Sequence, residues 1–281
     1  MSKQKKGFVL CMVAAAVMLV VSLLLPAAPK GETVQEAMRD AVLHESNRID
    51  LFGKEVNPGL ISAMTVSGIL LVVAACLRIF VIPRFQYVPG RLQLLLEELV
   101  GLFDRMAKSN SPERNGFLGA YIFGAGVYIF TGTIFELFGL QAVTTQGHSI
   151  ALPAPLSDIN AAIALGCLSY LVILSGGVAS NGMRGVGRTL KEFSLPISMS
   201  FRLFGALLSG LLVTELVYSY LALSFVLPVV VGVLFTILHA LIQTYVLTML
   251  TALFYGEVSE PPVLKPKTKK QKKVPSEVTS K

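Results

Sequence analysis

The sequence predicts an all-α polytopic membrane protein with about six transmembrane helices, the last two forming a long tilted hairpin, plus an amphipathic helix on the cytoplasmic surface. Of its 281 residues, 53% are hydrophobic and 15% are charged, against about 45–50% and about 25% in soluble domains. The apolar residues fall in uncharged runs of about 19 residues or more, long enough to cross a hydrocarbon core of about 30 Å. Lys and Arg gather in alternate loops. A soluble globular enzyme is therefore excluded.

The last apolar run is long enough for two helices. Pro228 cannot donate a backbone hydrogen bond and disfavours helix at the residue before it, so we expect a break near 225–228. Residues 193–227 and 229–256 would form helices of about 52 Å and about 42 Å, which are longer than the bilayer core is thick. The hairpin should therefore lie obliquely across the bilayer. The runs are 7–27, 59–77, 117–140, 159–179 and 193–256.

The first run has two interpretations. Three lysines precede it and it ends in Leu25–Pro29, as in a secretory signal, but the A-x-A cleavage pattern is poor and Pro29 follows Ala28. We expect a retained helix, with cleavage as the alternative.

Orientation follows from the Lys and Arg residues. Nineteen of the 24 lie before the first run, around 78–116, in 179–192 or after 256, while 28–58 has four with six acids. Both termini should therefore be cytoplasmic. This placement also explains the net charge of +7, so we expect no nucleic-acid partner. Three regions result: an N-terminal helix with its outer loop (1–58), a helical core (59–256) and a basic cytoplasmic tail (257–281).

Two segments outside the spans have a recognisable pattern. Residues 89–108 place leucines at helical spacing, which predicts an amphipathic helix that either lies on the cytoplasmic membrane surface or packs on the bundle. Residues 264–273 are rich in lysine and broken by proline, so they are either a solvated tail or attracted to anionic lipid.

Only three strongly ionisable side chains fall within 193–256: Arg202, Glu215 and His239. Arginine remains protonated, and at mid-bilayer depth it costs about 2.5–3.5 kcal/mol on insertion scales. Arg202 must therefore meet water or an anion, unless a tilted helix brings it to the interface.

Small residues share the helix face of Arg202. Such a stripe is typical of two fixed, closely packed helices, but with a cation at its centre it also suits a partner that slides past with a carboxylate. Glu215 lies about 220° around the helix axis from Arg202 and therefore faces another environment. The stripe consists of Ser198, Gly205, Ala206 and Ser209.

On the last helix, Thr236, His239 and Gln243 form a polar stripe that stops midway. It indicates either an aqueous channel from the outer surface or a hydrogen-bonded packing contact. Acidic residues near the outer ends of two other spans lie in the same outer half of the membrane as this stripe. A single acid at the end of a span is usually an interfacial cap. These possible channel residues are Glu136, Asp158 and Asn160.

No phosphate loop, metal-spaced histidines or Ser/His/Asp set is present, so we expect no cofactor, metal or nucleotide site and no catalytic residue.

The segment from Pro196 to Gly205 (PISMSFRLFG), followed by Gln243, closely resembles subunit a of the membrane sector of bacterial rotary F-type ATP synthases. Weaker similarities cover residues 88–93 (VPGRLQ), Glu136 and residues 155–160.

This resemblance implies a non-catalytic, ion-conducting stator in the bacterial inner membrane, which passes protons through two half-channels to and from carboxylates on a rotating c ring. Arg202 would be the essential cation, Gln243 would lie beside it, and Glu136 would line the outer half-channel. Further implied partners are the b-subunit peripheral stalk and lipids.

The chain departs from the family pattern at several positions. Ala206, Leu211 and Thr236 replace polar or ionisable residues of many relatives, so Glu215 and His239 would be displaced substitutes. The alternative function is a secondary transporter that binds an anionic substrate at Arg202, although no inverted repeat is seen.

Overall fold

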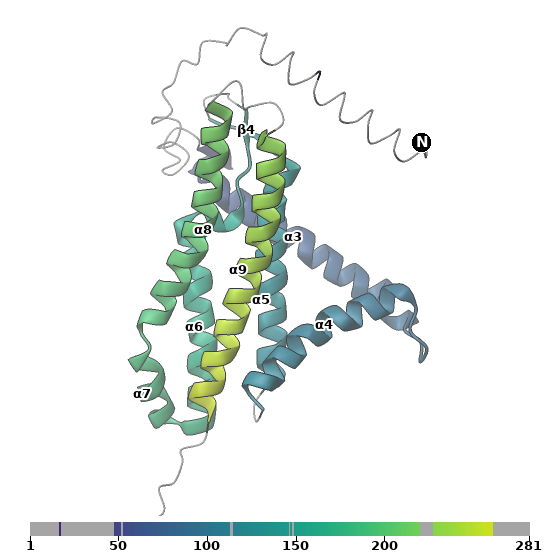
Figure 1. Ribbon diagram of the computed structural model, residues 1–281, viewed down its shortest axis with the longest axis vertical. Coiled ribbons are helices and arrows are strands. Elements are labelled where there is room, and N and C mark those ends of the chain that lie inside the picture. Colours follow the sequence, from purple (N-terminus) through teal and green to yellow (C-terminus); the bar gives the residue numbers. More distant parts are fainter. Residues whose placement is uncertain are drawn as a thin grey trace, which may run out of the picture.

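The computed structural model is mainly helical (Figure 1). It describes residues 17, 48–51, 53–112, 115–145, 147, 149–219 and 227–260; within these, the side chains of 211, 214–219 and 227–231 are not described. Apart from Val17, the predicted first span lies outside the described residues, and so does the lysine-rich tail.

Four described segments are long and apolar enough to cross a membrane, and a fifth is formed by two helices bent by 48° at a short break. The all-α polytopic class is thus confirmed, with four spans in the described residues, or five if the bent pair is one span. The segments are Pro58–Arg84, Gly116–Phe138, Ile159–Asn181, the bent pair Met183–Lys191 with Ser194–Gly210, and Gly232–Ser259.

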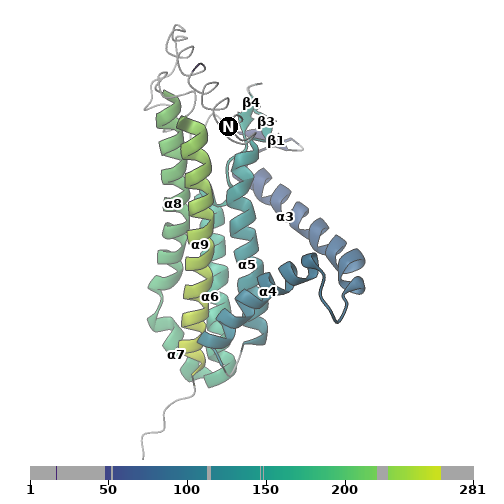
Figure 2. The ribbon, with the colours of Figure 1, turned by 45° about the vertical axis from the view of Figure 1, so that its right-hand side comes forward.

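The bundle consists of α5 (Gly116–Phe135), α6 (Ile159–Asn181), α8 (Ser194–Ser219) and α9 (Leu227–Ser259), which run side by side (Figures 1 and 2). α9 packs on α5 and α6, and α8 packs on α6. α9 begins one residue before Pro228, as expected for a proline in the first turn of a helix. The core includes Phe103, Leu118, Ile122, Ile129, Ile173, Met199, Leu203, Leu247 and Tyr255.

Close helix contacts in this bundle occur at glycines. A Cβ at Gly166 of α6 would overlap Ser200 Oγ of α8, and a Cβ at Gly256 of α9 would overlap the Asn110 carbonyl oxygen. Two further hydrogen bonds fix the end of α9, because Asn181 Nδ2 donates to the carbonyls of Val258 and Glu260 at 2.9 Å each.

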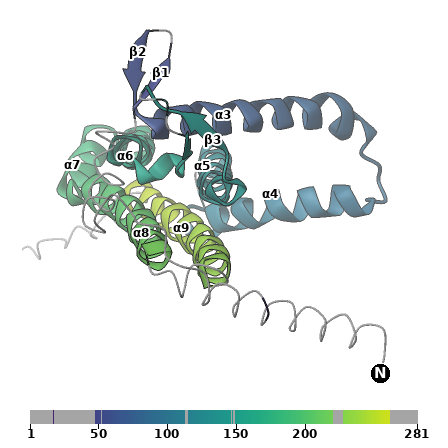
Figure 3. The ribbon, with the colours of Figure 1, turned by 90° about the horizontal axis from the view of Figure 1, so that it is seen from above.

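α3 (Pro58–Cys76) and α4 (Arg91–Asn110) diverge from the bundle and are joined at their far ends (Figure 3). α3 continues through a π-helical turn (η1, Leu77–Val81) and a 3₁₀ turn (η2, Ile82–Arg84). Only the last part of α4 packs on α5 and α9, through Phe103 and Ala107. The expected amphipathic helix is therefore present, and it combines bundle packing at one end with exposed leucines at the other.

The remaining elements are short. α7 (Met183–Lys191) precedes α8, and the expected single run from residue 193 thus begins with a bend, because Glu192 and Phe193 interrupt the helix. Two antiparallel hairpins that the sequence analysis does not predict cover the opposite end of the bundle: β1 (Ile49–Leu51) with β2 (Lys54–Val56), and β3 (Gln141–Val143) with β4 (Ser149–Ala151). Two 3₁₀ turns are also present, η3 (Glu136–Phe138) and η4 (Pro155–Ser157).

Candidate functional site

Arg202 lies on the exposed side of α8, eight residues after the helix begins. At 1.5 Å per residue this is about 12 Å along the helix axis from its first residue. Among the described residues, no hydrogen bond or ion pair involves its guanidinium. The chain therefore presents a permanent cation without a partner from its own described residues.

The small-residue stripe around Arg202 is also open. Ser198, Gly205 and Ser209 are exposed, and a Cβ built at Gly205 meets no atom within 4 Å. Ser209 Oγ donates to the Ala206 carbonyl at 2.8 Å, which satisfies that hydroxyl within the helix. The stripe is thus not a contact between two fixed helices in the described part of this chain.

Exposed apolar side chains also line one side of α9, where they recur at spacings of four, three and four residues. Such a face, long and without a partner in the described chain, is typical of a surface covered by lipid or by another protein. The α9 residues are Leu234, Leu238, Leu241 and Tyr245, and α8 adds Ile197 and Phe201.

A small cavity lies within the bundle, on the side of Arg202 that leads toward the C-terminal end of α8. Its volume is about 20 Å³, which is room for about one water molecule. On α8 it reaches Ala206 and Gly210, about 6 Å and about 12 Å beyond Arg202. The other lining residues are Thr133, Glu136, Leu207, Phe235, Thr236 and His239.

Three of the predicted polar residues therefore line the same cavity: Glu136 at the end of α5, and Thr236 and His239 on α9. Glu136 is half-buried, and its carboxyl has no hydrogen-bond partner among the described residues. Thr133 is a lining residue that the sequence analysis does not single out. Its place three residues before Glu136, on the same helix face, is the pattern that would have revealed it.

The His239 ring is held by its own helix. Nδ1 lies 2.9 Å from the Phe235 carbonyl oxygen, and the ring stacks on the Phe235 ring with centroids 5.2 Å apart. Because a carbonyl oxygen only accepts, Nδ1 carries the hydrogen in this contact, and Nε2 remains available to take or give a proton. The cavity thus combines a carboxyl, a hydroxyl and an imidazole, which together can bind water and relay protons.

Gln243 is placed differently. It is 6% exposed on α9, and no hydrogen bond within the described residues joins it to Arg202. Its position beside Arg202 stays a prediction. Glu215 lies on α8, but its side chain is outside the described residues.

Asp158 and Asn160 form a helix cap. The Asp158 carboxylate accepts from the Asn160 backbone N–H at 2.9 Å and from its side-chain amide at 3.2 Å, at the start of α6. Neither residue lines the cavity at Glu136. Their capping contact satisfies the first turn of α6.

No group of three His, Cys, Asp or Glu residues suited to a metal ion occurs in the part of the chain that the structure describes.

Comparisons with known proteins agree with this architecture. Residues 62–256, 195 of the 281, match the family described as ATP synthase A chain. Two similar proteins, both named ATP synthase subunit a, come from Cereibacter sphaeroides strains ATCC 17025 and ATCC 17029; each is 26% identical over 199 residues, covering 66% of this chain and 76% of the relative. One from Acidothermus cellulolyticus is 27% identical over 185 residues, covering 60% and 65%. The chain belongs to the ATP synthase A chain family.

Proposed function

We propose that this chain is the proton-translocating stator subunit of a rotary ATP synthase and that Arg202 is its essential cation. One observation carries the proposal. An arginine with no partner among the described side chains lies on the open face of α8, next to a cavity lined by a carboxyl and an imidazole. Family membership does not favour the alternative of a secondary transporter.

The open face of α8 and α9 is the proposed contact with a ring of c subunits. Its small residues at Ser198, Gly205 and Ser209 let a ring helix approach closely, and its apolar residues match a helix surface in lipid. A ring carboxylate that reaches Arg202 is stabilised in its deprotonated form by the cation. The cation also repels protons, which keeps the two half-channels separate.

The cavity at Glu136 is the proposed end of the outer half-channel. A proton from the outer surface would reach water there and pass between Glu136, Thr236 and His239 before it neutralises a ring carboxylate leaving Arg202. Gln243 and Glu215 are proposed to act further along the same path. The chain itself performs no ATP chemistry in this scheme.

We propose that the protein lies in the bacterial inner membrane, and the Lys and Arg distribution supports a topology with both termini in the cytoplasm. In this topology the loop between α3 and α4 is cytoplasmic. The assembly would also include a b-subunit peripheral stalk and membrane lipids.

The experiment that tests the proposal is ATP-driven proton pumping in inverted vesicles that carry the assembled complex. We expect Arg202→Ala to abolish pumping while the complex still assembles, because no other described cation lies on that face. Arg184→Gln, which removes an exposed arginine of α7, is the matched control and should pump normally. Undiminished pumping by Arg202→Ala would show that the assignment of this residue is wrong.

A further inference from the structure

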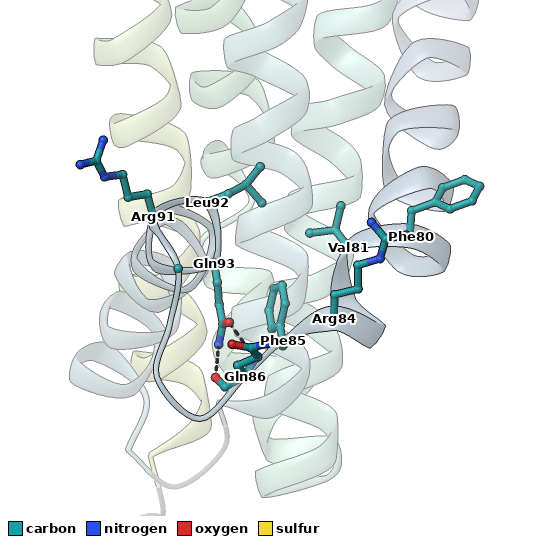
Figure 4. Close-up of a pocket in the computed structure, with 9 residues that line it drawn as sticks. Phe80, Val81, Arg84, Phe85, Gln86, Arg91, Leu92 and Gln93 are labelled. Carbon is teal, nitrogen blue, oxygen red and sulfur yellow. Dashed lines mark hydrogen bonds between the residues drawn. The ribbon is translucent and has the colours of Figure 1, made fainter.

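A second hollow lies where α3 ends and α4 begins, distant from the cavity at Glu136. Its volume is about 360 Å³. Figure 4 shows Phe80 and Arg84 on the α3 side and Arg91 at the start of α4, with Phe85 between them. The exposed Arg84 and Arg91 side chains extend away from one another, so each must turn toward the hollow to reach an anion in it. Apolar surface and cations thus border the same space.

The depth of this hollow in the membrane follows from α3. The apolar span from Pro58 ends at Arg84, so the hollow lies where the hydrocarbon core gives way to lipid headgroups. Exposed apolar side chains continue from it in both directions, with Ile79 and Phe80 on the α3 side and Leu92 and Leu95 on α4. These surfaces suit hydrocarbon chains.

The charge of the segment is one-sided. Residues 77–96 contain Arg78, Arg84 and Arg91 and no acid. All three arginines are exposed, and none forms an ion pair or hydrogen bond with another described residue. The nearest acid along α4, Glu97, accepts a hydrogen bond from Gln93 Nε2 at 2.7 Å. Two of these arginines, Arg84 and Arg91, line the hollow, and their guanidinium groups are available to an anion.

The loop between the helices is held in shape by one side chain. Gln93 Oε1 accepts from the Gln86 backbone N–H, and Gln93 Nε2 donates to the Gln86 carbonyl, both at 3.0 Å (Figure 4). This paired contact fixes the loop against the first turns of α4, so the hollow exists before anything binds in it.

We propose that this hollow binds the phosphate headgroup of an anionic phospholipid. Arg84 and Arg91 donate to the phosphate oxygens, and the acyl chains lie along the exposed apolar residues of α3 and α4. Arginine suits this role because its planar guanidinium makes two parallel hydrogen bonds to phosphate. A basic pocket at the cytoplasmic ends of transmembrane helices is a known kind of site for such lipids. The leaflet depends on the topology given above.

The test uses the assembled complex in phosphatidylcholine nanodiscs with a trace of photoactivatable phosphatidylglycerol or, in parallel, photoactivatable phosphatidylcholine. The measured quantity is the label on peptides from 77–96. Each arginine near the membrane surface should contribute about fivefold to the preference for the anionic lipid. We therefore expect phosphatidylglycerol to label the segment more strongly, and each of Arg84→Gln and Arg91→Gln to reduce that excess about fivefold.

Arg184→Gln on α7 is the matched control and should leave the labelling unchanged, while ATP hydrolysis by every variant confirms assembly. Equal labelling by the two lipids in the wild-type complex would overturn the proposal, and so would an anionic preference that survives in the double variant. Crosslinks from this segment to a partner subunit in place of lipid would show that a protein helix covers the hollow, which would also overturn it.

Discussion

Substitution of Gly166 should displace the helix that carries Arg202. A Cβ at this position of α6 would lie 3.0 Å from the Pro196 carbonyl oxygen and 3.2 Å from the Ser200 nitrogen, and it would overlap Ser200 Oγ. The hydroxyl of Ser200 cannot turn away freely, because it donates to the Pro196 carbonyl at 2.6 Å. The α8 backbone must therefore retreat from α6 by a few tenths of an ångström.

The cost of Gly166→Ala can be estimated from this geometry. Overpacking of a tight helix contact costs about 1–3 kcal/mol, and loss of the Ser200 hydrogen bond adds about 1 kcal/mol. Arg202 lies two residues after Ser200, so the same shift moves its guanidinium relative to the proposed c ring. We expect a melting temperature several degrees lower and reduced ATP-driven proton pumping by complexes that still assemble.

Gly68→Ala provides the control for this prediction, since a Cβ at Gly68 of α3 meets no atom within 4 Å. That variant should be as stable as the wild type or slightly more so, because alanine favours helix over glycine by about 0.5–1 kcal/mol. If Gly166→Ala melts and pumps like Gly68→Ala, the close contact between α6 and α8 is absent and the reasoning is refuted.

Three other outcomes can be measured on the same complexes. Glu136→Gln keeps the shape of the cavity but removes the proposed proton carrier, so pumping should fall at unchanged assembly; wild-type rates would exclude Glu136 from the pathway. Asn181→Ala removes two hydrogen bonds to the end of α9 and should cost about 1–3 kcal/mol in thermal unfolding, whereas an unchanged melting curve would contradict this. Gly256→Ala must push the Asn110 carbonyl away, so protease cleavage between α4 and α5 should become faster, and equal cleavage would show that α4 is held elsewhere.

The spans were predictable because lipid imposes a simple rule on sequence. A run without charges and of sufficient length must cross the bilayer as helix, since its backbone polar groups have no other partners there. The amphipathic pattern of 89–108 was equally readable and gave α4. The bend before α8 was not, because residues 179–192 were interpreted only as a charged loop and the helical turns of α7 depend on packing against α6.

The site was predictable in part for the same reason. Arg202, Glu136 and His239 are conspicuous in apolar runs, and their chemistry demands an explanation. The sequence could not show which of these three residues line the same cavity. Glu136 and His239 come from helices more than 90 residues apart in the chain, and their contact with one cavity depends on how α5 and α9 pack. The role of Asp158 as a cap likewise depends on the place where α6 begins.

The exposed position of Arg202 is unfavourable in the isolated chain. On the bare face of α8 its guanidinium would confront lipid, at about 2.5–3.5 kcal/mol on insertion scales, and no described side chain offsets this with an opposite charge. The cavity with Glu136 begins at Ala206, on the same stripe as Arg202 and about one helical turn beyond it, so the cation and the proposed proton carriers of α5 and α9 border neighbouring parts of the α8 surface. A carboxylate that moves along the outer face would therefore meet the cation first and the cavity within one or two helical turns. This sequence of contacts, charge stabilisation followed by protonation, is what a stator needs in order to couple proton entry to movement in one direction.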